Sequence, residues 1–334
     1  MSDTTMFDYI NTHWENAILP TLQQYIAIPN KSPHFDPNWA ANGFMHQAVI
    51  LLTDWCKQQD LNLHLEVVTL PDRTPLIFIE VPGSNDETIL MYGHMDKQPE
   101  MKGWDEDLHP WKPVLKGDKL YGRGGADDGY AIFASLTAIL ALQKQGIAHA
   151  RCVIIIEACE ESGSYDLPFY IDALESRIGQ PDLVICLDSG CGNYEQLWMT
   201  TSLRGLVGGE LKIDVLHQGI HSGQGSGIVP SCFLVLRQLL NRIEDEMSGQ
   251  IIFEPLITPI PEQRIVQAEK AAEVLKDQVY ATLPLVTGMQ PVSEDVPALI
   301  LNRTWRPALS ITGAEGLPAI ENAGNVSLLS LIHI

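Results

Sequence analysis

Two short stretches place acidic and histidine side chains where apolar runs end. The first reads MYGHMD at residues 91–96, and the second reads EACEESG at residues 157–163. Charged side chains are costly to bury unless a partner compensates their charge. A bound divalent cation would be such a partner for four side chains, namely His94, Asp96, Glu160 and Glu161.

Further acidic residues extend this group. We expect two more strand exits to deliver acids, with Asp127 and Asp128 in YGRGGADDGY and Asp188 at the end of the apolar run of ICLDSG. Ligands of an open α/β sheet bind in the crevice outside the carboxyl ends of its strands. Carboxylates gathered there repel one another and cannot all stay ionised unless cations relieve the repulsion. Imidazole combined with carboxylates favours zinc, with cobalt or manganese as alternatives.

Each motif alone has a simpler interpretation. A lone H-x-D is more often structural than metal-binding, and an acidic pair is usually a solvated face. GRGG is typical of a phosphate cradle, although the two acids that follow it disfavour an anion. The pair Glu160-Glu161, however, ends the run CVIIIEAC, which is not a surface pattern. The combination therefore predicts a metal site more strongly than any one motif does.

Alternating strands and helices must position these groups. Apolar residues at three- and four-residue spacing predict helices over 5–27 and 41–59. A third helix is expected over 127–145, with Asp127 and Asp128 near its favourable N-terminus. Together with strands, these helices predict an α/β sheet that is covered on both faces. Runs rich in Val, Ile and Leu predict the strands, at 63–70, 75–83, 87–96, 151–161 and 182–190.

The pattern changes near Arg204. Residues 205–219 alternate apolar and polar side chains, as a half-exposed strand does, and residues 231–247 form an amphipathic helical pattern. A second domain is expected from residue 205 onward.

Composition excludes several classes of partner. The chain has 334 residues, and its formal net charge of −21 disfavours nucleic acid and anionic membranes. Its six cysteines form no C-x-x-C pair and are expected to be reduced. The N-terminus lacks the pattern of a secretory signal, and the apolar run 131–142 is shorter than the ~20 residues that span a bilayer. We therefore expect a cytoplasmic protein.

The order of the motifs is specific. GHMD, YGRGGADDG, EACEESGS, LDSG, LRG and GIHSG follow one another as in the di-zinc peptidase family, which this chain resembles. That family includes carboxypeptidase G, succinyl-diaminopimelate desuccinylase, aminoacylase and cytosolic carnosine dipeptidase. The resemblance is nearest the dipeptidase branch. It implies an α/β catalytic domain, with a mixed sheet flanked by helices, and an inserted α+β lid that often mediates homodimers.

The resemblance also implies metal ligands. His94 and Asp188 would bind one Zn²⁺, Glu161 would bind a second, and Asp127 would bridge the two ions. Co²⁺ or Mn²⁺ would also suit such a site. Asp128 is expected to be a helix-end residue and not a ligand.

Catalytic and substrate-binding roles follow from the same resemblance. Glu160 would be the general base toward a metal-bridged water, and Asp96 would orient His94 by hydrogen bonding. His221 in the HSG motif would stabilise the oxyanion, although a loop histidine beside glycines is the simpler interpretation. Asn325 and Arg303 would contact the substrate, although packing or surface roles suit Arg303 equally well.

These roles imply metal-dependent hydrolysis of a peptide bond in dipeptides or short peptides with a free carboxylate. An N-acyl amino acid deacylase or desuccinylase is the alternative within the same chemistry. A non-catalytic, truncated metal-binding fragment is the alternative from a different class.

Two departures from the family stand out. The acidic pair is followed by Gly129-Tyr130, where the family often has D-D-K-G. The chain also ends at SLLSLIHI, before the family's last histidine ligand of the second metal, so we expect an incomplete second site and weak or no activity.

We accordingly expect residues 1–204 to be the N-terminal part of the catalytic domain and residues 205–328 to be an incomplete lid. The codons CTG-TCT-CTT-ATA-CAC-ATC encode LSLIHI and resemble a transposon end used in sequencing libraries. We interpret residues 329–334 as sequencing-adapter read-through, with a genuine apolar terminal strand as the alternative.

Overall fold

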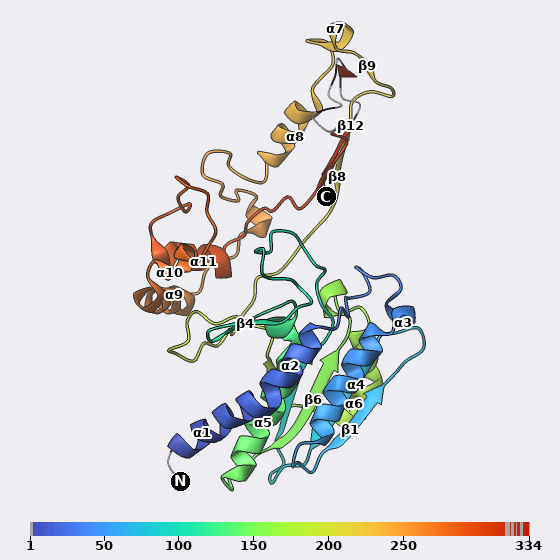
Figure 1. Ribbon diagram of the computed structural model, residues 1–334. Helices are drawn as coiled ribbons and strands as arrows, with labels where there is room; N and C mark the ends of the chain where they lie inside the picture. Colours follow the sequence, from blue (N-terminus) through green and yellow to red (C-terminus); the bar gives the residue numbers. More distant parts are fainter. Residues whose placement is uncertain (1–2, 318–320, 322–323, 325, 328–329, 334) are drawn as a thin grey trace. The chain divides into compact units, whose positions relative to one another are not determined.

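The computed structural model describes residues 3–317, 321, 324, 326–327 and 330–333. The chain divides into two compact units, Met1–Gly190 and Cys191–Ile334 (Figure 1). The division into catalytic and lid domains after residue 204 stays a prediction.

The first unit is built around a five-stranded mixed sheet with the order β1-β2-β6-β3-β7 (Figure 1). The strands β1, β2 and β6 pair in antiparallel fashion, whereas β6, β3 and β7 run parallel to one another. The predicted mixed α/β sheet is thereby confirmed. Because β3 lies between two parallel neighbours, the carboxyl ends of these three strands meet at one edge of the sheet. The strands span His64–Val68 (β1), Leu76–Val81 (β2), Thr88–His94 (β3), Arg151–Glu157 (β6) and Leu183–Cys186 (β7).

Helices cover both faces of this sheet. Alternate residues of β2 point in opposite directions, so Ile77 and Ile79 pack with α2, α4 and α5, while Phe78 packs with α6. Burial on both faces explains why the strands β2 and β6 read as continuous apolar runs. The helices are α1 (Asp3–His13), α2 (Leu19–Ile26), α3 (Trp39–Asn42), α4 (Phe44–Lys57), α5 (Ala131–Lys144) and α6 (Leu167–Ile178), with a π-helical segment Trp14–Ile18 between α1 and α2.

The segment before α5 differs from the sequence-based expectation. Helix α5 begins at Ala131, and Gly125–Gly129 forms an irregular turn in which Asp127 and Asp128 have non-helical backbone angles. The Oδ2 atom of Asp128 accepts the backbone N–H of His94, the last residue of β3, at 3.2 Å. This contact holds Asp128 outside the helix. Because it joins residues that are far apart in the chain, the spacing of apolar residues does not predict it.

Asp127 does not follow a strand of the main sheet. The preceding strands β4 (Val114–Lys116) and β5 (Lys119–Tyr121) form a separate antiparallel hairpin. The expectation that each acidic motif would lie at a sheet strand's exit is therefore wrong for Asp127.

Among the described residues, the stretch Gly125–Lys144 has the length and apolar composition that a membrane span requires, and 61% of it is buried inside the protein. Its apolar side chains belong to the core of the first unit, where Ile132, Phe133 and Leu136 are buried.

The second unit combines short helices with antiparallel strands. One small core joins Ile213 of β8 to Cys232 and Leu236 of α8, and another joins α9 to α11. The predicted helix over 231–247 ends early, at Leu240. Strand β12 pairs with β8 and β10, and the interpretation of residues 329–334 as read-through stays a prediction. The elements are β8 (Leu211–Asp214), β9 (Ile220–His221), α7 (Ser222–Gly225), α8 (Cys232–Leu240), α9 (Glu262–Leu275), α10 (Gln278–Ala281), α11 (Val296–Thr304), β10 (Ala314–Glu315), β11 (Val326–Ser327) and β12 (Ser330–His333).

Candidate metal centre

The ends of three parallel strands and one turn bring the predicted metal ligands together. His94 is the last residue of β3, and Asp188 follows the end of β7. Glu160 and Glu161 begin a 3₁₀ turn, Glu160–Ser162, just after β6. Asp127 reaches the same place from the irregular turn that precedes α5.

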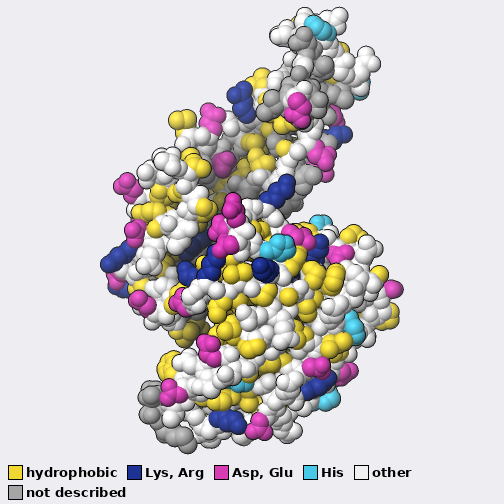
Figure 2. Space-filling model, in the orientation of Figure 1, with side chains coloured by type: hydrophobic (Ala, Val, Ile, Leu, Met, Phe, Trp, Pro, Cys, Tyr) yellow, Lys and Arg dark blue, Asp and Glu magenta, His cyan; other side chains and the backbone are white. Residues whose placement is uncertain are grey.

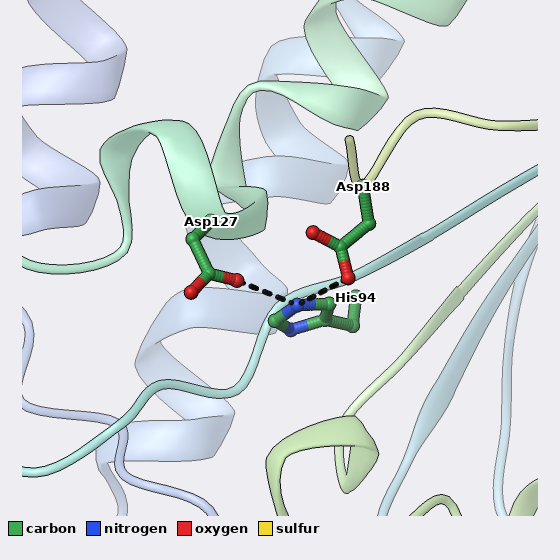
Figure 3. A group of neighbouring side chains, drawn as sticks. All are labelled: His94, Asp127 and Asp188. Atoms are coloured by element: carbon green, nitrogen blue, oxygen red, sulfur yellow. Dashed lines mark hydrogen bonds and ion pairs between the residues drawn. The ribbon is translucent and has the colours of Figure 1, made fainter. Parts of the chain in front are cut away.

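Carboxylates converge on one nitrogen of His94. Its Nε2 lies 3.2 Å from Asp127 Oδ1, 3.7 Å from Asp188 Oδ2 and 3.8 Å from Glu160 Oε2. Figure 3 shows the carboxylates of Asp127 and Asp188 approaching the imidazole from two sides. Among the residues that the structure describes, two sets of three have ligand atoms within 4.8 Å of one another, namely His94-Asp127-Asp188 and His94-Glu160-Glu161.

The other imidazole nitrogen fixes the ring. His94 Nδ1 lies 3.0 Å from the backbone carbonyl oxygen of Asp96, which suits an Nδ1–H donor and leaves Nε2 as the nitrogen that would bind a metal in place of its proton. The Asp96 carboxylate is 3.5 Å from Nδ1, but its two oxygens accept the backbone N–H groups of Glu160 at 3.1 Å and Glu161 at 3.0 Å. Asp96 thus ties the β3 exit to the β6 exit, a contact that the sequence did not reveal.

The charges of the centre are strongly coupled. Burial opposes the charged form of His94, but hydrogen bonds to Asp127 and Asp96 and the nearby carboxylates outweigh it and raise the pKa of His94 to about 11. The hydrogen bond with His94 lowers the pKa of Asp127. Burial raises the pKa of Glu160, and it raises that of Glu161 to about 7. In the metal-free protein, bound protons therefore neutralise part of the negative charge of the carboxylates, as a metal cation would.

The residues present fit a divalent cation. Within the described part of the chain, Glu161 Oε1 is buried and has no hydrogen-bond partner, whereas Oε2 accepts the side-chain N–H of Gln98. An unpaired buried acceptor costs roughly 1–3 kcal/mol, and a bound cation would pair with it. One imidazole nitrogen among several carboxylates is a donor set that zinc accepts.

Two contacts around the centre, and the burial of Asp128, were not predicted. Gln98 binds Glu161, and the Tyr130 hydroxyl donates to the carbonyl of Leu187, next to Asp188. Asp128 lies in the irregular turn before α5, where it is fully buried, and burial raises its pKa to about 7. The sequence signal for this buried carboxylate was the pair of adjacent acids in a glycine-rich stretch.

The remaining predicted site residues lie outside the first unit. His221 ends β9, is exposed, and accepts the backbone N–H of Gly223 through Nδ1 at 3.0 Å. Arg303 is exposed in the last turn of α11, where a cation also suits the helix dipole. Asn325 lies outside the described residues. The roles of these three residues stay predictions.

We expect about one tightly held zinc ion per chain after zinc loading and desalting. Both three-residue sets use His94, and a single Nε2 can bind only one ion, so the two sets cannot be filled at once through that nitrogen. Elemental analysis of the folded protein measures the ratio. Two ions per chain would show that another residue or a neighbouring chain completes a second site.

The metal-free protein should lose stability as the pH rises. Asp128 and Glu161 each have a folded-state pKa of about 7, above their ordinary values of 3.8 and 4.5. Between those values the folded state binds more protons than the unfolded state, so the free energy of unfolding falls with rising pH. The raised pKa of His94 acts in the same direction above its ordinary value of 6.5.

We therefore expect a lower Tm for chelator-treated protein near pH ~8 than near pH ~5.5. Saturating zinc should remove most of that difference, because the cation replaces the protons. Glu161→Gln should flatten the chelated curve, and a Tm that rises across this window in the chelated parent would contradict the prediction.

Comparison with known proteins gives one family match. The profile described as "Peptidase family M20/M25/M40" matches residues 90–323. The chain is similar to Beta-Ala-His dipeptidase of Mus musculus, with 27% identity over 93% of this chain and 64% of that protein. Cys-Gly metallodipeptidase of Saccharomyces cerevisiae is 29% identical over 81% of this chain and 57% of its own length. The cysteinylglycine-S-conjugate dipeptidase of Corynebacterium striatum is 27% identical over 90% and 63%, respectively. The chain thus spans 57–64% of the length of these curated relatives.

Solved structures share the fold. Human carnosine dipeptidase 1 aligns with a TM-score of 0.65 and 23% identity, covering 98% of this chain and 70% of that one. The dipeptidase Dug1p of Saccharomyces cerevisiae aligns with a TM-score of 0.64 and 24% identity, covering 99% and 70%. At these identities the likeness concerns the fold alone.

Proposed function

Because the chain belongs to peptidase family M20/M25/M40, we propose that it hydrolyses the amide bond of dipeptides or short peptides that carry a free carboxylate. The observation that carries this proposal is the convergence of Asp127, Asp188 and Glu160 on Nε2 of His94. The names of the curated relatives, two of which refer to Beta-Ala-His and Cys-Gly, support dipeptides as the substrate class.

The proposed cofactor is zinc, with two ions in the complete site and cobalt or manganese as substitutes. His94, Asp127, Asp188 and Glu161 would hold it. When bound, divalent metal would act as a Lewis acid toward the scissile carbonyl and would lower the pKa of water toward neutrality.

The protein's own residues would handle the proton. Glu160 stands at the edge of the centre, and Asp96 fixes the backbone of its turn. The Glu160 carboxylate would take a proton from the attacking water as the new C–O bond forms, then pass it to the leaving nitrogen as the C–N bond breaks. Burial raises the pKa of Glu160, which makes it a stronger base than an exposed glutamate.

The second unit would complete the reaction. His221 is proposed to donate to the developing oxyanion, and Asn325 and Arg303 are proposed to contact the substrate. We also propose a homodimer formed through this unit, which sedimentation analysis would test.

A cytoplasmic location is part of the proposal. In the described part of the chain the six cysteines are free, which suits a reducing compartment. On the face shown in Figure 2, acidic and basic side chains are interspersed. The formal net charge of −21 disfavours a polyanionic partner.

A substrate panel tests the function. Metal-loaded protein would be offered dipeptides such as Cys-Gly and β-Ala-His alongside N-acetyl and N-succinyl amino acids, with chelator-treated protein as the control. We expect amine release from the dipeptides that depends on metal. Faster release from N-acyl amino acids would replace the proposal by a deacylase, and bound metal without any hydrolysis would replace it by a non-catalytic metal-binding protein.

A further inference from the structure

Lys97 carries a fully buried amino group that the proposed mechanism does not use. It follows Asp96 directly, and among the described residues no carboxylate forms an ion pair with it. A buried charge is retained only where other groups compensate it. The contacts of its side chain therefore show what it does.

The ammonium group of Lys97 closes the C-terminal end of α2. Its Nζ donates to the backbone carbonyls of Tyr25 at 2.7 Å, Ile28 at 2.8 Å and Ile26 at 3.5 Å. It also lies 3.9 Å from the centre of the Tyr25 ring. The carbonyls at a helix C-terminus carry partial negative charge, and an ammonium has three N–H donors for them. Burial lowers the pKa of Lys97. Hydrogen-bond acceptors around an ammonium group favour its charged form.

The residues that follow His94 at the end of β3 are hydrogen-bonded to α2 and to the residues that follow α2. The carbonyl of Met95, between His94 and Asp96, accepts both the Tyr25 hydroxyl and the Asn30 side-chain N–H at 2.6 Å. The backbone N–H of Ser32 in turn donates to the carbonyl of Lys97 at 3.0 Å. Main-chain and side-chain contacts of Lys97 thus hold the segment that positions His94.

The glycine-rich loop packs on the stem of Lys97. A Cβ at Gly124 would lie 2.6–2.7 Å from three methylene carbons of Lys97, and Gly124 has a φ of +79°. A Cβ at Gly129 would overlap the Tyr25 ring, and one at Gly122 would overlap Ile26. The glycines are needed for this close approach, which gives GRGG a packing role in place of a phosphate cradle. Asp127 belongs to the same loop, between Gly124 and Gly129.

We propose that Lys97 is a positioning residue for the metal centre. The methylene groups of Lys97 contact Gly124 and so fix the position of the loop that carries Asp127. The terminal amino group of Lys97 holds this loop and the residues after His94 against the end of α2. The inference rests on the proposed function only for the identity of the metal site. Loop order and metal affinity test it without any measurement of hydrolysis.

The main test replaces Lys97 by Met, which keeps an apolar stem of similar length but removes the three N–H donors. In the metal-free protein, hydrogen exchange of the amides of residues 122–129 should become faster than in the parent. Affinity for Co²⁺ should fall about tenfold, as is typical when groups behind a metal ligand are lost, and the visible spectrum of bound Co²⁺ should change. Lys144→Met is the matched control, because Lys144 is exposed and its ion pair, with Asp60 at 3.0 Å, lies away from the metal centre.

A rescue experiment separates positioning from loss of fold. Lys97→Ala leaves a cavity that propylammonium can fill, so the amine, but not propanol, should slow loop exchange and restore Co²⁺ affinity. If neither variant folds unaided, propylammonium should restore a cooperative thermal unfolding transition to Lys97→Ala, whereas propanol should not.

The proposal is overturned if Lys97→Met exchanges and binds Co²⁺ as the parent does, or if propanol rescues as well as the amine. If the parent protein binds Co²⁺ but hydrolyses no peptide, the proposed function is wrong. The hydrogen-exchange and Co²⁺-affinity comparisons still decide the role of Lys97. A parent that binds no Co²⁺ would leave the exchange comparison to decide.

Discussion

Glu160→Gln is expected to lower dipeptide hydrolysis by about 10²–10⁴-fold while the metal stays bound. Glutamine has nearly the same shape but cannot accept a proton at neutral pH. The backbone N–H of residue 160 would still donate to Asp96, so the turn should keep its form. Initial rates with a dipeptide and elemental analysis of the same sample give the two readings.

The metal reading separates two roles for Glu160. Its carboxylate belongs to one of the candidate ligand sets, with His94 and Glu161, so the geometry also allows it to be a ligand. Loss of both metal and hydrolysis would make Glu160 a ligand, and unchanged rates would remove it from the mechanism. Glu175→Gln, on an exposed position of α6, is the control and should change neither reading.

His94→Ala is expected to abolish both metal retention and hydrolysis. The affinity for zinc should fall by more than the roughly 10–100-fold that loss of a group behind a ligand typically causes. Both candidate ligand sets depend on His94, and its Nε2 is the point on which the carboxylates converge. Without the imidazole, the remaining carboxylates would have to hold a cation alone.

Zinc content after desalting and competition with a chromophoric chelator measure this effect. His64→Ala is the control, because His64 is exposed on β1 and should retain parental metal binding. Full zinc retention by His94→Ala would place the metal site elsewhere in the protein.

The family could be inferred from the sequence because its motifs are short, ordered and chemically specific. The motif order GHMD, ADDG, EACEES and LDSG pointed to the peptidase family whose profile matches residues 90–323. The mixed sheet was also predictable, because its central strands β2 and β6 are buried almost throughout and read as continuous apolar runs. Both inferences depend on residues that are close together in the chain.

The start of α5 and the origin of Asp127 were not predictable in this way. Apolar periodicity extended the helix back to residue 127, but the buried contact between Asp128 and the backbone of His94 holds an irregular turn there. That contact joins residues 34 positions apart, so no local pattern reports it.

The sequence by itself determined which residue types stand at the strand ends, and hence the chemistry that they can support. Only the tertiary structure decided that β3 lies between β6 and β7, that three carboxylates face one nitrogen of His94, and that Lys97 lies under the loop of Asp127. The physical reason is that periodicity records local burial along one element. Strand order and the close approach of loop backbones depend instead on how distant segments share a common core.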